Sequence, residues 1–349
     1  MRIAIIGYGG VGKAFTQLIN NKREYLYRRS LEIQVNYIIN SSGGIYNSQG
    51  IDCSELIEFL KWEKDITKYK KGGSEKISLD TILQNNDIDM AIEVTSTNKK
   101  TGEPGMTHIR KCLENGIHVV TANKGPILLA YKELKDLALR NGVGLGVGCT
   151  AGGALPSING GLIDLAGAEI ISIEGVLNGT TNFIINEMEH KAVSYLEALK
   201  KAQELGIAEL DASLDVEGWD TASKLLILTN ILMDEEKILN DITIEGITEI
   251  TKEEVMKCLQ EGKKYKLLGR TVKENGRINM SVKLEKLDIT HPLYGVDGKN
   301  KGVTYKTDVL GDLTIIGGAS GVISAAASIL RDIINISKEY RTTKKFYKM

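Results

Sequence analysis

Short apolar runs alternate with amphipathic stretches through the first 150 residues of the chain. The apolar runs that we expect to form strands are 2–6, 32–39, 88–94, 116–120 and 142–147. Helices are expected over 11–20, 107–115 and 128–141. Strands that alternate with helices form a parallel sheet with helices on its faces. The pattern therefore predicts an α/β domain at residues 1–150, built on a Rossmann-type, doubly wound parallel sheet.

The pattern changes after Pro156, where strands and helices no longer alternate regularly. Proline suits a first helical turn, so a helix is expected over 156–166. Further strands are expected over 169–177, 264–273, 277–287, 303–307 and 313–316, and helices over 181–190, 194–205 and 218–232. The sequence Glu-Asn-Gly at 274–276 predicts a hairpin. We therefore predict a second α/β domain at 151–317, and a last helix, 318–340, that packs back on the first domain and completes it.

Two segments are expected to lie outside this framework. Residues 43–79 are polar, contain glycines and are rich in lysine, so they predict an elaborated surface loop without chemistry. Residues 341–349 are basic and predict a frayed tail.

A glycine-rich turn follows the first expected strand. Residues 7–12 fit the pattern G-x-G-x-x-G and open the first helix. In this pattern Gly7 permits the tight turn, Gly9 lets the backbone approach a pyrophosphate, and Gly12 allows the helix to pack closely on the strand. The helix N-terminus favours phosphate charge. We therefore predict that NAD or NADP binds here, at Gly7, Gly9, Gly10, Val11 and Gly12.

The same residues admit a second interpretation, because 7–13 also spell G-x-x-x-x-G-K. A P-loop needs a hydroxyl after its lysine to bind magnesium. Ala14 stands at that position, so this interpretation ranks well below dinucleotide binding.

The second strand bears on the choice between the two cofactors. It ends at Asn40-Ser41-Ser42, where an acidic residue would bind the ribose of NAD. No acid is present, which favours NADP, but no arginine follows either. We expect Asn40 to contact the cofactor, with a slight preference for NADP.

Polar residues also follow the later strands. Thr95 and Ser96 follow one strand, and Asn123 and Lys124 follow the next. Ligands of open parallel sheets bind outside the carboxyl ends of the strands. These four residues are therefore predicted to contact the cofactor, with Lys124 close enough to act on the substrate.

The acidic stretch 202–225 carries the second candidate site. Glu209, Asp215 and Asp220 lie upstream of Lys224, and Asp220 and Lys224 are separated by four residues. On a helix, residues spaced in this way share one face. An ammonium ringed by carboxylates can bind a substrate amine and deliver a proton. The alternative is an exposed acidic loop followed by an ordinary helical ion pair.

Composition narrows the class of protein. The chain has 349 residues, enough for two domains, with 44 Lys and Arg against 45 Asp and Glu. Without a basic excess, nucleic acid or an anionic membrane surface is not expected as a partner. Four scattered cysteines indicate neither zinc nor a disulfide framework, and no apolar run is long enough to span a membrane. We expect a cytoplasmic protein that acts on a small molecule.

The chain resembles homoserine dehydrogenase in its short form, without kinase or regulatory domains. The most specific match is Gly-Val-Leu-Asn-Gly-Thr-Thr-Asn-Phe-Ile at 175–184, followed by the acidic stretch. Asn123-Lys124 and the glycine motif at 317–321, with Gly321 at the cofactor, also correspond. The resemblance covers essentially the whole chain. It implies reversible reduction of aspartate β-semialdehyde to homoserine with NAD(P)H, by a homodimer whose middle region forms the substrate and dimerisation domain.

The resemblance and the residues agree on the catalytic roles. Hydride arrives at the aldehyde carbon, and the aldehyde oxygen needs a proton as negative charge develops. Lys224 is the expected acid, and Asp220 would orient it and hold it charged. Lys124 would polarise the same oxygen or relay the proton.

Substrate binding falls to residues around the same stretch. Glu209 and Asp215 would bind the substrate ammonium by charge-assisted hydrogen bonds. Thr180 and the backbone at Gly179 would position the substrate. Two other functions stay open: a related reductase of another small amino aldehyde or keto compound, and a dinucleotide-binding regulator without activity. Retention of both Lys124 and Lys224 argues against the regulator.

Two positions depart from the family pattern. Gly148 occupies the place of a glutamate that helps to hold a monovalent cation, and Ala319 stands where a glycine is usual. Gly148 has no side chain, so the turn at 148–153 offers only neutral carbonyls. We therefore predict no metal site and no tight monovalent cation.

Overall fold

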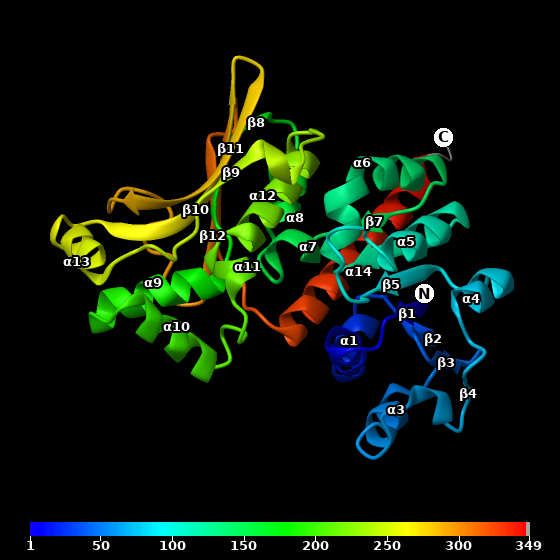
Figure 1. Cartoon of the computed structure of the whole chain (residues 1–349). Helices are drawn as coiled ribbons and strands as arrows, with labels where there is room; N and C mark the ends of the chain where they lie inside the picture. The colour runs from blue at the N-terminus through cyan, green and yellow to red at the C-terminus, as the bar shows by residue number, and fades with distance from the viewer. Residues whose placement is uncertain (347–349) are drawn as a thin grey trace. The chain divides into compact units, whose positions relative to one another are not determined.

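A computed structural model describes residues 1–346 of the chain, with side chains through residue 338. The chain forms two compact units: the first holds Met1–Thr150 together with the chain from Gly321 onward, and the second holds Ala151–Ser320. Each unit is built around its own sheet, as Figure 1 shows. Within the described residues, every helix is too short or too polar for a membrane span.

The sheet of the first unit has the strand order β4-β3-β2-β1-β5-β6-β7. Its strands are β1 (Arg2–Ile6), β2 (Gln34–Asn40), β3 (Gly43–Tyr46), β4 (Gly73–Ser74), β5 (Met90–Glu93), β6 (His118–Thr121) and β7 (Leu145–Gly146). Strands β2, β1, β5, β6 and β7 are parallel, and β3 and β4 add antiparallel strands at one edge. The predicted Rossmann-type parallel sheet is therefore confirmed.

Helices pack around this sheet. They are α1 (Gly10–Asn21), α2 (Arg23–Tyr27), α3 (Cys53–Phe59), α4 (Leu79–Asn85), α5 (Gly105–Glu114) and α6 (Lys124–Arg140), with a 3-10 turn, η1, at Ile66–Lys68. The middle residues of the central strands are mostly apolar because both faces of the sheet are covered. Ile3, Ile5 and Ile38 are completely buried, and Phe15 of α1 packs on them in one core.

The expectation of a surface loop over 43–79 is wrong. This segment contains β3, α3, η1, β4 and the start of α4. Ile45, Leu56 and Ile66 are buried in the core of the first unit. These apolar residues are spaced among lysines and glycines, so the overall composition of the segment did not indicate that part of it is buried.

The last helix, α14 (Val322–Phe346), belongs to the first unit. Ala326, Ile329 and Ile333 are fully buried in the same core as β1 and α1. Because α14 continues to Phe346, the frayed tail expected from residue 341 is wrong over 341–346. Residues 347–349 lie outside the described part of the chain.

The second unit contains a mixed sheet in the order β13-β12-β8-β10-β11-β9. Its strands are β8 (Ile170–Val176), β9 (Ile242–Ile244), β10 (Lys264–Glu274), β11 (Arg277–Leu287), β12 (Lys301–Thr307) and β13 (Asp312–Gly317). All neighbours are antiparallel except β9 and β11. The hairpin expected at 274–276 joins β10 to β11, with Asn275 and Gly276 both at positive φ.

The second unit also contains helices. They are α9 (Gly179–Lys191), α10 (Tyr195–Glu204), α11 (Ser213–Val216), α12 (Trp219–Leu232) and α13 (Lys252–Gln260), with a 3-10 turn, η3, at Leu239–Asp241. Helices α9, α12 and α13 contact β10. The single α-helix expected over 156–166 is wrong in type. A short α8 (Ser157–Asn159) passes into a π-helical turn, η2 (Gly160–Asp164), and α7 (Cys149–Gly152) precedes both.

Candidate active site

The glycine turn joins β1 to α1 in the first unit. Gly7 has φ +98°, and a Cβ atom placed on it would lie 2.7 Å from the backbone nitrogen of Thr95. A Cβ on Gly12 would lie 2.5 Å from the carbonyl oxygen of Gly7. A Cβ on Gly9 would meet no atom within 4 Å. Gly7 and Gly12 are therefore required by packing, whereas Gly9 leaves an open approach to the backbone, which suits a pyrophosphate.

Two further predicted cofactor residues open helix α1 beside this turn. Gly10 and Val11 are its first residues, where unpaired backbone N–H groups are available to an anion. A Cβ on Gly10 would lie 3.1 Å from Val322 Cγ1, at the start of α14. Gly321, with φ +103°, directly precedes Val322. The fold thus places Gly321 near the glycine turn, although more than 300 residues separate them in the sequence.

Glu93 organises the ends of β5 and β6, and sequence reasoning did not include it among the site residues. Its side chain is buried, and Oε1 accepts hydrogen bonds from both the backbone nitrogen and the hydroxyl of Thr95. Oε2 accepts one from the Thr121 hydroxyl at 2.9 Å. His108 Nδ1 lies 3.8 Å from Glu93 Oε1. One buried carboxylate therefore joins two strand ends and holds Thr95 in place.

Asn123 links the same strand ends to helix α6. Its Nδ2 donates to Thr95 Oγ1 at 3.3 Å and to the Ser96 carbonyl at 3.4 Å. Its Oδ1 caps the helix by accepting the Gly125 N–H at 3.1 Å. Lys124 is the first residue of α6 and is partly exposed. The structure therefore brings Thr95, Ser96 and Asn123 together, with Lys124 directly beside Asn123 in the chain.

Asn40 lies at the exposed carboxyl end of β2, where the predicted ribose contact would be. Its Oδ1 accepts the backbone N–H of Ser42 at 2.8 Å and so closes a local turn into β3. No described hydrogen bond joins Asn40 to the other predicted cofactor residues, and its contact with a cofactor stays a prediction.

Lys224 and Asp220 form an ion pair on α12 in the second unit. Lys224 Nζ lies 2.6 Å from Asp220 Oδ2, and both side chains are mostly buried, at 14% and 13% exposure. Lys224 Nζ also donates to the carbonyl of Leu177, at the end of β8, at 2.9 Å. The ammonium is thus held between a carboxylate and a strand end, and is not a loosely solvated surface charge.

Asn178 gathers the carboxylates of this site, and sequence reasoning assigned it no role. Its Nδ2 donates to Asp215 Oδ1 at 2.6 Å and to Asp220 Oδ2 at 2.9 Å. Asn178 also caps α9 through the Thr181 N–H. Asparagine is a common capping residue, so its type could have signalled a cap here, but its bonds to residues far along the chain leave no local signal.

The N-terminus of α9 carries the two remaining positioning candidates. Thr180 Oγ1 donates to the Ile207 carbonyl at 3.1 Å, which ties α9 to the loop before Glu209. A Cβ on Gly179 would lie 2.8 Å from the Lys299 carbonyl oxygen, so only glycine fits there without displacement.

A buried polar cluster fixes the loop that passes Gly179. Asn182 Nδ2 donates to the carbonyls of Val296, Gly298 and Asn300. The fully buried Lys266 donates to Asn182 Oδ1 at 3.1 Å and forms an ion pair with Asp297. Burial lowers the pKa of Lys266 despite the nearby Asp297. This cluster holds the chain at 296–300 against α9.

Glu209 differs from the other predicted carboxylates. It is exposed, and within the described residues its carboxylate makes no hydrogen bond or ion pair. Asp215 is half-buried and fixed by Asn178. The structure therefore brings Asp215, Asp220 and Lys224 together, whereas Glu209 is connected to them only through the loop that Thr180 contacts.

The turn after β7 was expected to lack a carboxylate. In the structure the Gly148 N–H donates to Asp332 Oδ2 of α14 at 2.7 Å, and Asp332 is buried. In the second unit, Lys301 Nζ donates to the Gly152 carbonyl at 3.0 Å. A backbone amide already engages the carboxylate, and an ammonium already engages a carbonyl of the turn. We assign no step to a cation at this turn.

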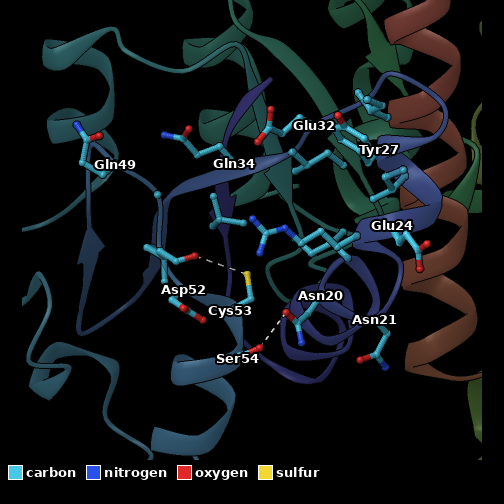
Figure 2. Close-up of a pocket in the computed structure, with 18 residues that line it drawn as sticks. Asn20, Asn21, Glu24, Tyr27, Glu32, Gln34, Gln49, Asp52, Cys53 and Ser54 are labelled. Atoms are coloured by element: carbon cyan, nitrogen blue, oxygen red, sulfur yellow. Dashed lines mark hydrogen bonds between the residues drawn. The ribbon is translucent and has the colours of Figure 1, made fainter.

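A hollow of about 850 Å³ lies elsewhere in the first unit, between the end of α1, the start of β2 and α3 (Figure 2). None of the predicted site residues lines it. Ser54 Oγ donates to Asn20 Oδ1 at 3.1 Å across it. Burial raises the pKa of Cys53 to about 11, so this thiol stays protonated at neutral pH and is a poor nucleophile. We assign no chemistry to this hollow.

A dinucleotide turn in one α/β unit and an ammonium–carboxylate set in a second are the parts of an NAD(P)-dependent oxidoreductase. A family model described as homoserine dehydrogenase matches residues 156–334, and one described as homoserine dehydrogenase, NAD binding domain, matches residues 7–147. The chain belongs to the homoserine dehydrogenase family.

Relatives support this membership over the full length of the chain. Homoserine dehydrogenase of Methanocaldococcus jannaschii is 39% identical over 99% of this chain and 100% of that protein. The NAD(+)-dependent homoserine dehydrogenase of Pseudomonas canavaninivorans is 33% identical over 96% of each. The crystal structure of a putative homoserine dehydrogenase from Archaeoglobus fulgidus has a TM-score of 0.85 and 31% identity, over 96% of this chain and 99% of that one. The reaction is the NAD(P)-dependent interconversion of aspartate β-semialdehyde and homoserine.

Proposed function

We propose that Lys224 donates the proton in this aldehyde reduction and that Asp220 orients it. The ion pair at 2.6 Å, anchored a second time at the Leu177 carbonyl, carries this proposal. Two acceptors on one ammonium fix its direction and leave one of its three N–H donors for a substrate oxygen. A positioned acid of this kind typically contributes 10²- to 10⁴-fold to turnover.

The residues divide the chemistry as follows. When bound, the reduced nicotinamide supplies the hydride to the aldehyde carbon. The electron pair of the carbonyl bond moves to oxygen, and Lys224 transfers a proton to that oxygen to complete the alcohol. Neutral Lys224 then regains a proton from solvent. Lys124 polarises the aldehyde oxygen or relays the proton.

Substrate binding falls to the carboxylates around Lys224. Asp215 keeps acceptor sites beyond its bond to Asn178, and the Glu209 carboxylate makes no bond within the described residues. Both suit a substrate ammonium, because charge-assisted hydrogen bonds are strong and directional. Thr180 and the backbone at Gly179 position the rest of the substrate.

The test is homoserine oxidation with NAD and NADP in parallel, by wild type, Lys224→Ala and a control. Lys201→Ala is the matched control, because Lys201 forms an exposed helical ion pair with Glu204. We expect Lys224→Ala to lose about 10²- to 10⁴-fold in kcat and the control to keep wild-type activity. Near-normal turnover of a folded Lys224→Ala would remove Lys224 from the mechanism.

We also propose that the chain forms a homodimer through its second unit. Strand β13 lies at the edge of the sheet, and the turn before it exposes Val309 and Leu310, with Ile316 exposed on the strand itself. Exposed apolar residues on an edge strand favour pairing with another chain. Sedimentation equilibrium tests this, and a monomer at micromolar concentration would contradict it. Within the described residues no cysteine forms a disulfide, which further suits a reducing, cytoplasmic location.

A further inference from the structure

The Asn178 side chain is hydrogen-bonded on both its oxygen and its nitrogen within the proposed substrate site. It directly precedes α9 and is only 3% exposed. Its oxygen accepts the Thr181 N–H at 2.9 Å, and its nitrogen donates to Asp215 at 2.6 Å and to Asp220 at 2.9 Å. A primary amide has two N–H donors, so both are used.

The two carboxylates that Asn178 joins would otherwise repel each other. Asp215 Oδ1 and Asp220 Oδ2 both accept hydrogen bonds from Asn178 Nδ2. The distance between these two oxygens therefore cannot exceed the sum of the two hydrogen-bond distances. Lys224 neutralises Asp220 at 2.6 Å, whereas the bond from Asn178 is the one interaction described for the Asp215 carboxylate. Without a donor between them, the two like charges would separate, because close like charges are destabilising at low dielectric.

We propose that Asn178 is a positioning residue for the reaction, an inference that rests on the proposed function of Lys224 and Asp215. Its amide sets the separation of the two carboxylates. Asp220 is thereby held against Lys224, and Asp215 is held with acceptor sites open for the substrate ammonium. Asn178 acts on the reaction through these two residues and does not touch the reacting atoms.

Residue chemistry explains why asparagine stands at this position. Asparagine, aspartate, serine and threonine are all good N-cap residues. Serine and threonine have one hydroxyl proton, and an ionised aspartate has no donor. Asparagine alone among these four caps the helix with its oxygen and still donates two hydrogen bonds. Capping and bridging can therefore be separated by mutation.

The experiment compares Asn178→Ser and Asn178→Asp with wild type. Both variants keep a capping oxygen, so α9 should stay capped, and any fall in Tm without ligands reports the lost bridge between the carboxylates. We expect Asn178→Ser to lower kcat/KM for homoserine about 10- to 100-fold, the usual consequence of losing hydrogen bonds to charged groups. Asn178→Asp should lose more, because it adds a third carboxylate. The dissociation constant of NADPH should stay within twofold of wild type for both.

Thr251→Ala is the matched control for loss of a cap in the same unit. Thr251 caps α13 through the Glu254 N–H, away from the site residues. This variant should unfold at a lower temperature and keep kcat/KM for homoserine. A purely structural role of Asn178 would give its variants the same behaviour as this control.

A double-mutant cycle with Asp215→Asn decides the question. If Asn178 acts through Asp215, the effect of Asn178→Ser on the homoserine KM should shrink in the Asp215→Asn background. Asn178→Thr carries the same expectations should the serine variant fold poorly. Constants within twofold of wild type for a folded serine or threonine variant, or effects that simply multiply in the cycle, would overturn the proposal. Normal turnover of Lys224→Ala would instead refute the proposed function, whatever the Asn178 variants do.

Discussion

Two glycines of one turn should respond to the same substitution in opposite ways. A Cβ on Gly12 would lie 2.5 Å from the Gly7 carbonyl oxygen, closer than real Cβ contacts allow, whereas one on Gly9 would meet nothing within 4 Å. Gly9 has φ −82° in an extended backbone, so no left-handed conformation requires glycine there. Gly9→Ala should therefore weaken the binding of a ligand that approaches the turn and leave the folded protein stable. Gly12→Ala should instead destabilise the folded protein.

The magnitudes follow from these contacts. Forcing a methyl group into a packed site costs about 1–3 kcal/mol, so Gly12→Ala should lower the Tm of the free protein by about 2–12 °C. At Gly9 the reduced entropy of the unfolded chain, about 0.4–1 kcal/mol, offsets the slightly poorer helix cap of alanine. The Tm of Gly9→Ala should thus stay within about 2 °C of wild type. The methyl group would stand where a pyrophosphate approaches, and loss of hydrogen bonds to that charge weakens binding about tenfold or more.

The assay is thermal unfolding with and without NADPH, together with titration of NADPH. Ligand binding to the folded state raises Tm in proportion to the logarithm of ligand concentration over Kd. Wild type should show a clear NADPH-induced rise, which Gly9→Ala should largely lose while unfolding normally without ligand. A Gly9→Ala variant that binds NADPH as wild type does would show that the phosphates lie elsewhere. A Gly12→Ala variant with unchanged Tm would show that the close approach to Gly7 is not a real constraint.

Three further predictions concern substrate, cofactor and cation. Glu209→Gln should mainly raise the homoserine KM, because it weakens a charge-assisted contact made in ground and transition states alike; an unchanged KM counts against this role. Isothermal titration should show that both cofactors bind, with NADP modestly preferred, because Asn40 and the two serines after it offer no carboxylate to repel a 2′-phosphate; much tighter NAD binding would mean that another residue reads the ribose. Activity should be nearly indifferent to exchange of sodium for potassium or a bulky organic cation at fixed ionic strength, because Lys301 already engages the Gly152 carbonyl; a specific sodium requirement would contradict this.

The features predicted from sequence are those fixed by neighbouring residues. The strand, glycine turn and first helix lie within 20 residues, and the spacing of the glycines indicates the backbone conformation of the turn. The spacing of Asp220 and Lys224 indicates a shared helix face in the same way. Such features follow from helix and turn geometry and need no knowledge of the fold.

The features that were missed depend on contacts between distant residues. Asn178 bonds to residues 37 and 42 positions away, and the Gly148 N–H meets Asp332 across 184 positions. Which of these distant polar side chains meet is determined by the tertiary fold and not by the local sequence. The segment 43–79 failed for a related reason: its core residues, such as Ile45 and Leu56, are spaced too irregularly among polar residues to show a period.

Each unit organises its candidate site by the same physical device, a buried polar side chain at the end of a strand. Glu93 ends β5 and accepts bonds from Thr95 and Thr121, on two different strand ends. Asn178 follows β8 and donates to two carboxylates. Glu93 is charged and Asn178 is neutral because their partners differ. The hydroxyl and amide groups around Glu93 need a hydrogen-bond acceptor, whereas the carboxylates around Asn178 need a donor. Because a buried group left without its partner costs more than the bond itself contributes, an exchange at either position that keeps the shape but changes the charge should be tolerated less well than a change at a residue it holds. Glu93→Gln and Asn178→Asp preserve shape and reverse part of this donor–acceptor pattern, so activity should be more sensitive to them than to Thr121→Val or Asp215→Asn.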